Sequence, residues 1–101
     1  VGVQELNYEL NYDYLYGVHL KEAQNLESKI KQKLEESEIS NAQVIVSIQK
    51  DSPEFFVTQI YVDLSQAVIS QNNGHIINYT TLRKTISEYA KVDQEKVVVD
   101  G

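Results

Sequence analysis

A chain of 101 residues has the size of one ordinary domain, and its share of hydrophobic residues, 42%, is enough for a packed core. The absence of cysteine excludes a disulfide scaffold, a zinc–thiolate site and a thiol nucleophile. The net charge of −6 argues against nucleic-acid binding, because such proteins normally present a basic face to the phosphates.

Residues 1–17 form a tyrosine-rich segment that we interpret as an N-terminal arm or linker. Two successive tetrapeptides, at 6–9 and 10–13, repeat the order Leu-Asn-Tyr-acidic residue, and four of the seven tyrosines precede Gly17. Asparagine, tyrosine and aspartate are mediocre helix formers, and Gly17 is expected to interrupt a helix here. The arm is expected to pack on the domain or on a neighbour, or to act as a linker, and residues 18–101 are expected to form a single α/β domain.

Residues 18–37 have the pattern of an amphipathic helix. Ala23, Leu26, Ile30 and Leu34 are spaced three, four and four residues apart, which aligns them on one side of a helix. The lysines of this segment are interleaved with glutamates, which is typical of a solvated helix surface and not of a basic patch.

Residues 43–50 and 54–64 are expected to form an antiparallel hairpin, because the connection between them is too short for a crossover. Strict alternation in the first strand places Val44, Val46 and Ile48 on one face. In the second strand, alternation separates two sets of residues. One set is Phe56, Ile60, Val62 and Leu64, and the other is Phe55, Val57, Tyr61 and Asp63.

Residues 65–79 allow two interpretations. Asn73-Gly74 is the dipeptide favoured in two-residue hairpin turns, and the segments 67–69 and 75–77 would then be the arms of a hairpin. A plain loop is the alternative.

Residues 81–91 are predicted to form a second helix, capped by Asn78 or Thr80, and residues 96–99 a last strand. The predicted fold class is therefore α+β, as a two-layer α-β-β-α-β sandwich with two helices on one face of a three-stranded sheet. The strand order does not follow from the sequence.

The sequence contains few residues in arrangements that catalysis requires. Neither His19 nor His75 has a second ligand at metal-binding spacing, and four glycines scattered along the chain make no phosphate loop. We therefore expect no enzyme activity, no catalytic residues, no metal and no cofactor. The tripeptide 78–80 matches the N-glycosylation pattern, but a helix cap at Asn78 explains it more simply.

We therefore expect the domain to act by protein–protein contact. Helices on one side leave the other face of the sheet open, and exposed apolar surface usually marks an interaction site. An alternative of equal weight is that the tyrosine-rich arm covers this face. The candidate interface residues are five on the open face and two lysines on the exposed side of the first helix: Ile45, Phe55, Val57, Tyr61, Val98, Lys29 and Lys33.

Two segments carry a resemblance to a known family. Residues 26–34 lead as a helix into the strand at 43–48, and residues 81–87 lead into the segment 92–99, which ends in the last strand. In this order of elements and hydrophobic spacing, residues 18–100 resemble the ring-building domains of bacterial secretion and sporulation complexes, and in particular the soluble C-terminal domain of the stage III sporulation protein AF family.

The resemblance implies a non-catalytic structural subunit of the channel that joins mother cell and forespore in an endospore former. It implies a membrane anchor of two transmembrane helices before Val1, which fits a chain without methionine. The implied partners are other subunits of a membrane-embedded complex, including copies of the same chain when anchored. No nucleic acid and no small-molecule substrate is implied.

Two alternative functions are also compatible with the predicted order of elements. A KH-like nucleic-acid-binding domain combines similar elements, but it needs a GXXG clamp, and no two glycines of this chain have that spacing. A regulatory protein-interaction domain is neither supported nor excluded by the sequence.

Overall fold

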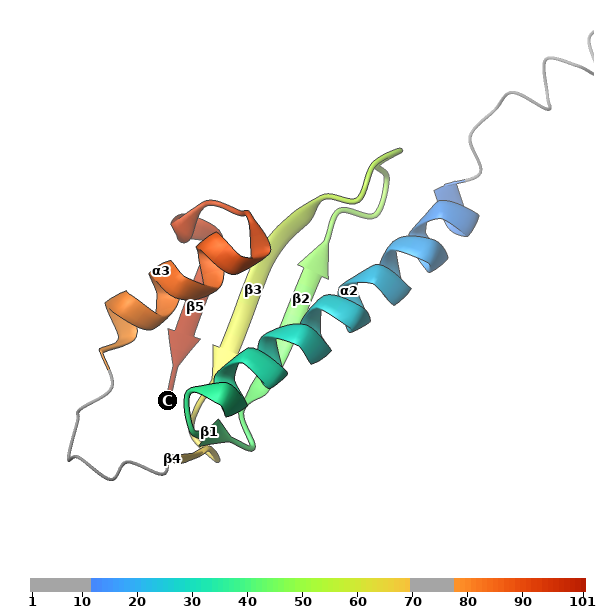
Figure 1. Cartoon of the computed structure of the whole chain (residues 1–101). Helices are drawn as coiled ribbons and strands as arrows, with labels where there is room; N and C mark the ends of the chain where they lie inside the picture. The colour runs from blue at the N-terminus through green and yellow to red at the C-terminus, as the bar shows by residue number, and fades with distance from the viewer. Residues whose placement is uncertain (1–11, 70–77) are drawn as a thin grey trace, which may run out of the picture.

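The computed structural model describes residues 12–69 and 78–101. Its elements are α2 (Tyr12–Glu36), β1 (Ile39–Ser40), β2 (Gln43–Ile48), β3 (Val57–Asp63), β4 (Val68–Ile69), α3 (Tyr79–Ala90), the 3-10 helix η1 (Gln94–Lys96) and β5 (Val97–Asp100). Both long helices lie on one side of a three-stranded sheet (Figure 1). The predicted α+β class, a two-layer α-β-β-α-β arrangement, is confirmed.

The sheet has the order β2-β3-β5 and is mixed. β2 and β3 are antiparallel, as predicted for the hairpin, whereas β3 and β5 are parallel. A parallel pair needs a long crossover, and here α3 lies within that crossover. The strand order, which the sequence left open, thus places β3 in the centre.

The core lies between the sheet and the two helices. Ile60 and Val62 of β3 are fully buried, as is Ile30 of α2, and Val97 of β5 is almost fully buried. Ile86 is the buried apolar residue of α3. These side chains come from both layers, so removal of any one leaves a gap that its neighbours cannot easily fill.

Helix α2 begins earlier than the sequence predicts. It starts at Tyr12 instead of residue 18, and Gly17 lies within it, so the expected interruption at Gly17 is wrong. A glycine inside a helix costs about 1 kcal/mol relative to alanine. Half-burial of Leu15 and Tyr16 and burial of His19 offset this cost by packing the helix on both sides of the glycine. The part of the arm before Tyr12 lies outside the described residues.

A β-bulge changes the predicted faces of β3. Ser47 pairs with Gln59 and Ile48 pairs with Val57, so Thr58 is an extra residue without a partner in this register. An extra residue moves the side chains of all residues before it in the strand to the opposite face of the sheet. Val57 is therefore on the core side and only 7% exposed, and its predicted place on the open face is wrong.

The same bulge places the two phenylalanines before it on the faces opposite to those predicted. Phe55 was predicted on the open face, but it is half-buried on the helix side and meets the His19 ring edge-on, with 5.9 Å between ring centroids. Phe56 was predicted on the core face but is exposed. The Nζ atom of Lys96 lies 4.1 Å from the centroid of the Phe56 ring, a cation–π contact at the surface.

The segment after β3 pairs with a distant part of the chain. β4 pairs antiparallel with β1, so that Ile39 opposes Ile69 and Ser40 opposes Val68. The side-chain amide of Asn41 donates a 2.9 Å hydrogen bond to the carbonyl of Gln66 beside this pair. The predicted turn at Asn73-Gly74 and its second arm lie outside the described residues.

Helix α3 is capped by Asn78, one of the two residues that the sequence offered. The Asn78 side-chain oxygen accepts hydrogen bonds from the backbone N–H groups of Thr80, at 2.9 Å, and Thr81, at 3.2 Å. These are donors that a helix start leaves without intrahelical partners. The helix ends at Ala90, and the C-cap residue Lys91 has a left-handed backbone conformation, with a φ of 60°.

None of the helices in the described ranges is both long enough and apolar enough to cross a lipid bilayer.

The burial of β3 gives a first prediction. Ile60→Ala is expected to lower the free energy of unfolding by about 2–5 kcal/mol, because it opens a cavity at a fully buried site. Ile45→Ala, at an exposed position of the neighbouring strand, serves as the control and is expected to change it by less than about 0.5 kcal/mol. Denaturant melts compare the two, and equal losses would contradict the assignment of faces.

The cap of α3 gives a second prediction. Asn78→Ala is expected to cost about 0.5–2 kcal/mol, because two backbone N–H groups lose their acceptor. Asn78→Asp keeps an acceptor oxygen and is expected to retain the stability. Thermal melts followed by far-ultraviolet circular dichroism measure both, and an unaffected alanine variant would show that the cap contributes nothing.

Candidate functional site: the open sheet face and the opposite helix side

The open face of the sheet carries one apolar row across all three strands. Ile45 of β2 opposes Tyr61 of β3, and Tyr61 is the register partner of Val98 in β5. Ile45 is 54% exposed, and Tyr61 and Val98 are half-buried. The structure thus aligns three of the five residues predicted for this face, and it removes Phe55 and Val57 from it.

The next row on the same face is acidic. Asp63 of β3 lies in register with Asp100 of β5 and with Gln43 of β2. The hydroxyl of Tyr61 donates a 3.1 Å hydrogen bond to Asp100 Oδ2, and this bond raises the pKa of Tyr61. The backbone N–H of Ser65 donates to Asp63 Oδ1 at 2.9 Å, and this bond lowers the pKa of Asp63. The open face is therefore an apolar strip with an anionic border.

The two candidate lysines lie on the helix side. Lys33 is half-buried, and its Nζ atom is 5.7 Å from the centroid of the Tyr89 ring of α3. Lys29 is exposed and borders a hollow of about 280 Å³ whose other residues include Phe55 and Ala90. The predicted candidates are thus divided between two opposed surfaces of the domain.

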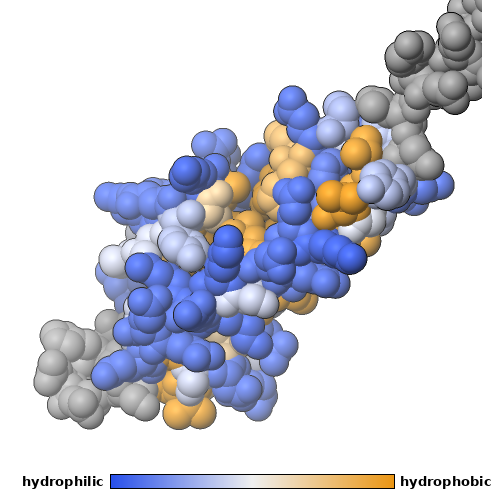
Figure 2. Space-filling model, turned by 45° about the vertical axis from the view of Figure 1, so that its right-hand side comes forward, coloured by the Kyte–Doolittle hydropathy of each residue, from blue (hydrophilic) through white to orange (hydrophobic). Residues whose placement is uncertain are grey.

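A second hollow continues from the first. It has a volume of about 330 Å³, shares Phe55 and Ala90 with it, and extends to Phe56, Val92 and Lys96. Figure 2 shows apolar surface between hydrophilic side chains on this side of the molecule. Alternation along the strand does not indicate this groove, because the bulge at Thr58 turns Phe55 toward the helices.

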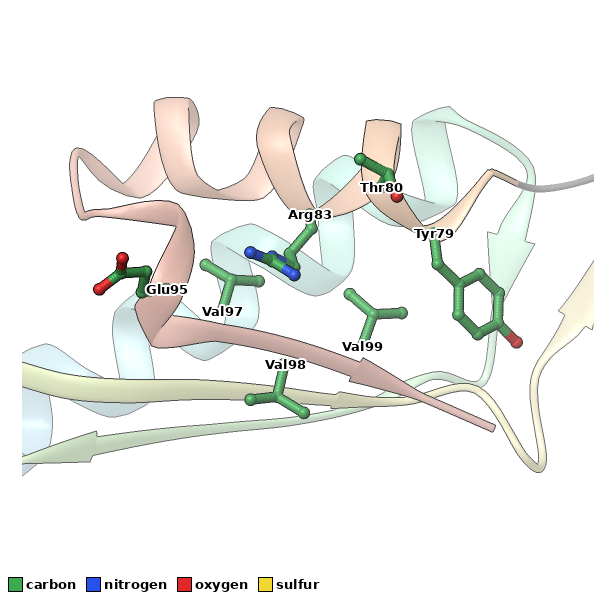
Figure 3. Close-up of a pocket in the computed structure, with 7 residues that line it drawn as sticks. All are labelled: Tyr79, Thr80, Arg83, Glu95, Val97, Val98 and Val99. Carbon is green, nitrogen blue, oxygen red and sulfur yellow. The ribbon is translucent and has the colours of Figure 1, made fainter.

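A third hollow, of about 400 Å³, lies between α3 and β5. Figure 3 shows Val97 and Val99 directed toward the helix, Val98 directed to the opposite side, and Arg83 crossing the space between helix and strand. The Nε–H of Arg83 donates to the carbonyl of Gln94 at 3.1 Å, so part of the guanidinium is used inside the domain.

A side chain from α2 occupies one backbone N–H on the outer edge of β2. The backbone N–H of Val46 donates a 2.8 Å hydrogen bond to Glu27 Oε2. A free N–H on an edge strand is a template for pairing with another chain, and a carboxylate that occupies it hinders such pairing. No sequence pattern indicates this contact, because it joins residues 19 positions apart.

The side chains that could perform chemistry are dispersed. No group of three or more His, Cys, Asp or Glu side chains in residues 12–69 and 78–101 is arranged to hold a metal ion. His19 is 5% exposed and packs against Phe55, and its Nδ1 atom is buried without a hydrogen-bond partner. His75 lies outside the described residues.

Comparison with known proteins adds no relative: no protein-family model matches the chain, and no curated protein matches its sequence.

The corrected position of Val57 gives a third prediction. Val57→Glu is expected to destabilise the fold strongly, because it places a charge at a site that is only 7% exposed. Thr58→Glu, at the exposed neighbouring position, is the matched control and is expected to leave the melting temperature nearly unchanged. If the two variants melt alike, the bulge is misplaced.

The pKa of Asp63 gives a fourth prediction. Because its folded-state pKa is below the ordinary value of 3.8, Asp63 stabilises the fold above that pH, and this contribution is lost as the pH falls through the folded-state pKa. Asp63→Asn removes the titration. The difference in melting temperature between the wild type and this variant is therefore expected to be constant above about pH 5 and to shrink as the pH falls below that value. A difference that stays constant with pH would contradict the Ser65 contact.

Proposed function

We propose that this chain is a non-catalytic assembly domain that acts by protein–protein contact, as a ring-building-type subunit of a membrane-anchored sporulation channel between mother cell and forespore. The observation that carries the proposal is the apolar row of Ile45, Tyr61 and Val98 on a sheet face that no helix of the described chain covers.

The fold supports this proposal. The order α-β-β-α-β, with both helices on one side, is the arrangement that the resemblance to ring-building domains implies (Figure 1). The stage III sporulation channel is the particular assembly that the resemblance suggests.

The distribution of candidate residues supports a head-to-tail contact. A ring needs two different surfaces on each subunit, so that the front of one copy meets the back of the next. The open sheet face with Ile45 and the helix side with Lys29 lie on opposite layers of the domain. Asp63 and Asp100 border the sheet face, and Lys29 on the helix side is the cation that we propose to meet them.

Attachment to a membrane would strengthen such a contact. Anchoring raises the local concentration and fixes the orientation, and linkage of this kind raises avidity by about 10² to 10⁴ without a new contact. We therefore expect the isolated domain to be mainly monomeric at micromolar concentration and to assemble when it is anchored.

A charge on the apolar row tests the proposal. Ile45→Glu is expected to leave the melting temperature of the domain nearly unchanged, because the site is 54% exposed, and to abolish cross-linked oligomers of the anchored full-length protein. Val68→Glu, at a strand residue that is equally open to solvent, is the matched control and is expected to keep the oligomers. Undiminished cross-linking in Ile45→Glu would show that the sheet face is not the interface.

Cysteine trapping tests the head-to-tail geometry directly, because the chain has no cysteine of its own. Two single variants of the anchored protein, Ile45→Cys and Lys29→Cys, are co-expressed and oxidised. A disulfide-linked heterodimer is expected, with little product from either variant alone. Equal yield from Ile45→Cys alone would indicate a two-fold contact between sheet faces in place of a ring contact.

A further inference from the structure

The N-terminal end of α2 differs in composition from the rest of the same helix. Between Tyr12 and Leu20 the only charged residue is Asp13, whereas the sixteen residues from Lys21 to Glu36 include eight charged ones. A change of this size within one continuous helix indicates that its two parts meet different surroundings.

The apolar residues of this end do not form a single stripe. At about 100° per residue, they cover roughly two thirds of the helix circumference. Tyr14 is 68% exposed, and Tyr12, Val18 and Leu20 are also exposed. We call this set the tyrosine collar: Tyr12, Tyr14, Leu15, Tyr16, Val18 and Leu20.

The width of the collar distinguishes between kinds of partner. Leu15 and Tyr16 pack partly on the domain, and the four exposed members of the collar are spread over more than one side of the helix. A second helix or a protein groove contacts one stripe of a helix, whereas apolar residues on several exposed sides are matched by lipid around the helix end. Tyrosine combines an apolar ring with a hydroxyl and is enriched where membranes meet water. Figure 1 shows this end of α2 at the opposite end of the domain from the C-terminus.

Charge selects the kind of lipid. The chain has a net charge of −6 and the collar contains no lysine or arginine, so an anionic surface would repel it. A zwitterionic headgroup avoids this repulsion, and its quaternary ammonium group binds aromatic faces. The Tyr16 ring already contacts a cation in this way, with Lys50 Nζ 5.9 Å from its centroid.

We propose that the tyrosine collar is a lipid-contact site that places the N-terminal end of α2 in the headgroup region of a zwitterionic phospholipid bilayer. This inference rests on the membrane attachment in the proposed function, and it adds that the domain itself touches the bilayer. The contact orients the sheet and helix surfaces for assembly. It depends on apolar and aromatic groups, so it is insensitive to salt.

A single tryptophan tests the inference, because the chain has none. The 101-residue chain carries an N-terminal histidine tag and is tethered to phosphatidylcholine vesicles that contain a nickel-chelating lipid. Tryptophan emission of Tyr14→Trp is expected to shift to shorter wavelength on tethering and to be quenched by brominated phosphatidylcholine. Tyr89→Trp, at an exposed tyrosine of α3, is the matched control and is expected to show neither change.

A further variant separates the collar from the probe itself. Val18→Gln and Leu20→Gln, combined with Tyr14→Trp, keep good helix formers at exposed positions, and circular dichroism checks the fold. The shift and the quenching are expected to be largely lost in this variant. Their persistence would mean that the introduced tryptophan alone inserts, and the inference would be wrong.

Three other outcomes would also overturn the inference. The first is no shift with tethered vesicles. The second is a shift that appears without vesicles as the protein concentration rises, which would indicate contact with a second copy. The third is a shift that needs anionic lipid and disappears in salt. The proposed assembly is tested separately, by cross-linking of Ile45→Glu. The lipid contact can therefore be wrong while the assembly is right, and the reverse also holds.

Discussion

The rest of the structure depends on the burial of one face of β3 while both of its edges are paired. Ile60 and Val62 are fully buried, and each fully buried aliphatic side chain contributes about 1.5–3 kcal/mol. The antiparallel partner β2 follows from a short turn, but the parallel partner β5 requires a crossover. Helix α3 lies within that crossover and covers β5, so the central position of β3 determines where both helices pack.

The bulge at Thr58 decides which residues lie on each face of the sheet. Downstream of it, Tyr61 faces the open side of the sheet, and upstream of it Phe55 and Val57 face the helices. One extra residue therefore reduces the apolar surface on the open face and creates the groove that contains Phe55. Bulges that redirect side chains in this way are common where a sheet forms a functional surface.

Three surfaces of the described domain differ in the groups that they present to solvent. Glu27 occupies the N–H of Val46 at the outer edge of β2, which disfavours pairing of that edge with another strand. The open face keeps its apolar row, the helix side keeps its lysines, and the end of α2 keeps its tyrosine collar. In the proposed function these three surfaces have separate tasks, two toward neighbouring subunits and one toward lipid.

The sequence by itself determined the class of fold, the hairpin, the existence of two amphipathic helices and the Asn78 cap, because each of these depends on residues close together in the chain. Ile45, Tyr61 and Val98 were also placed on one face by alternation alone. The start of α2 at Tyr12 was not predictable, since the packing of Leu15, Tyr16 and His19 outweighs the local preference against helix at Gly17. The tertiary structure decided the position of the bulge, because alternation along one strand does not show where that strand has an extra residue relative to its partner. It also decided the parallel pairing of β5 and the contact between Glu27 and Val46, because these join segments whose distance in the chain leaves no local pattern.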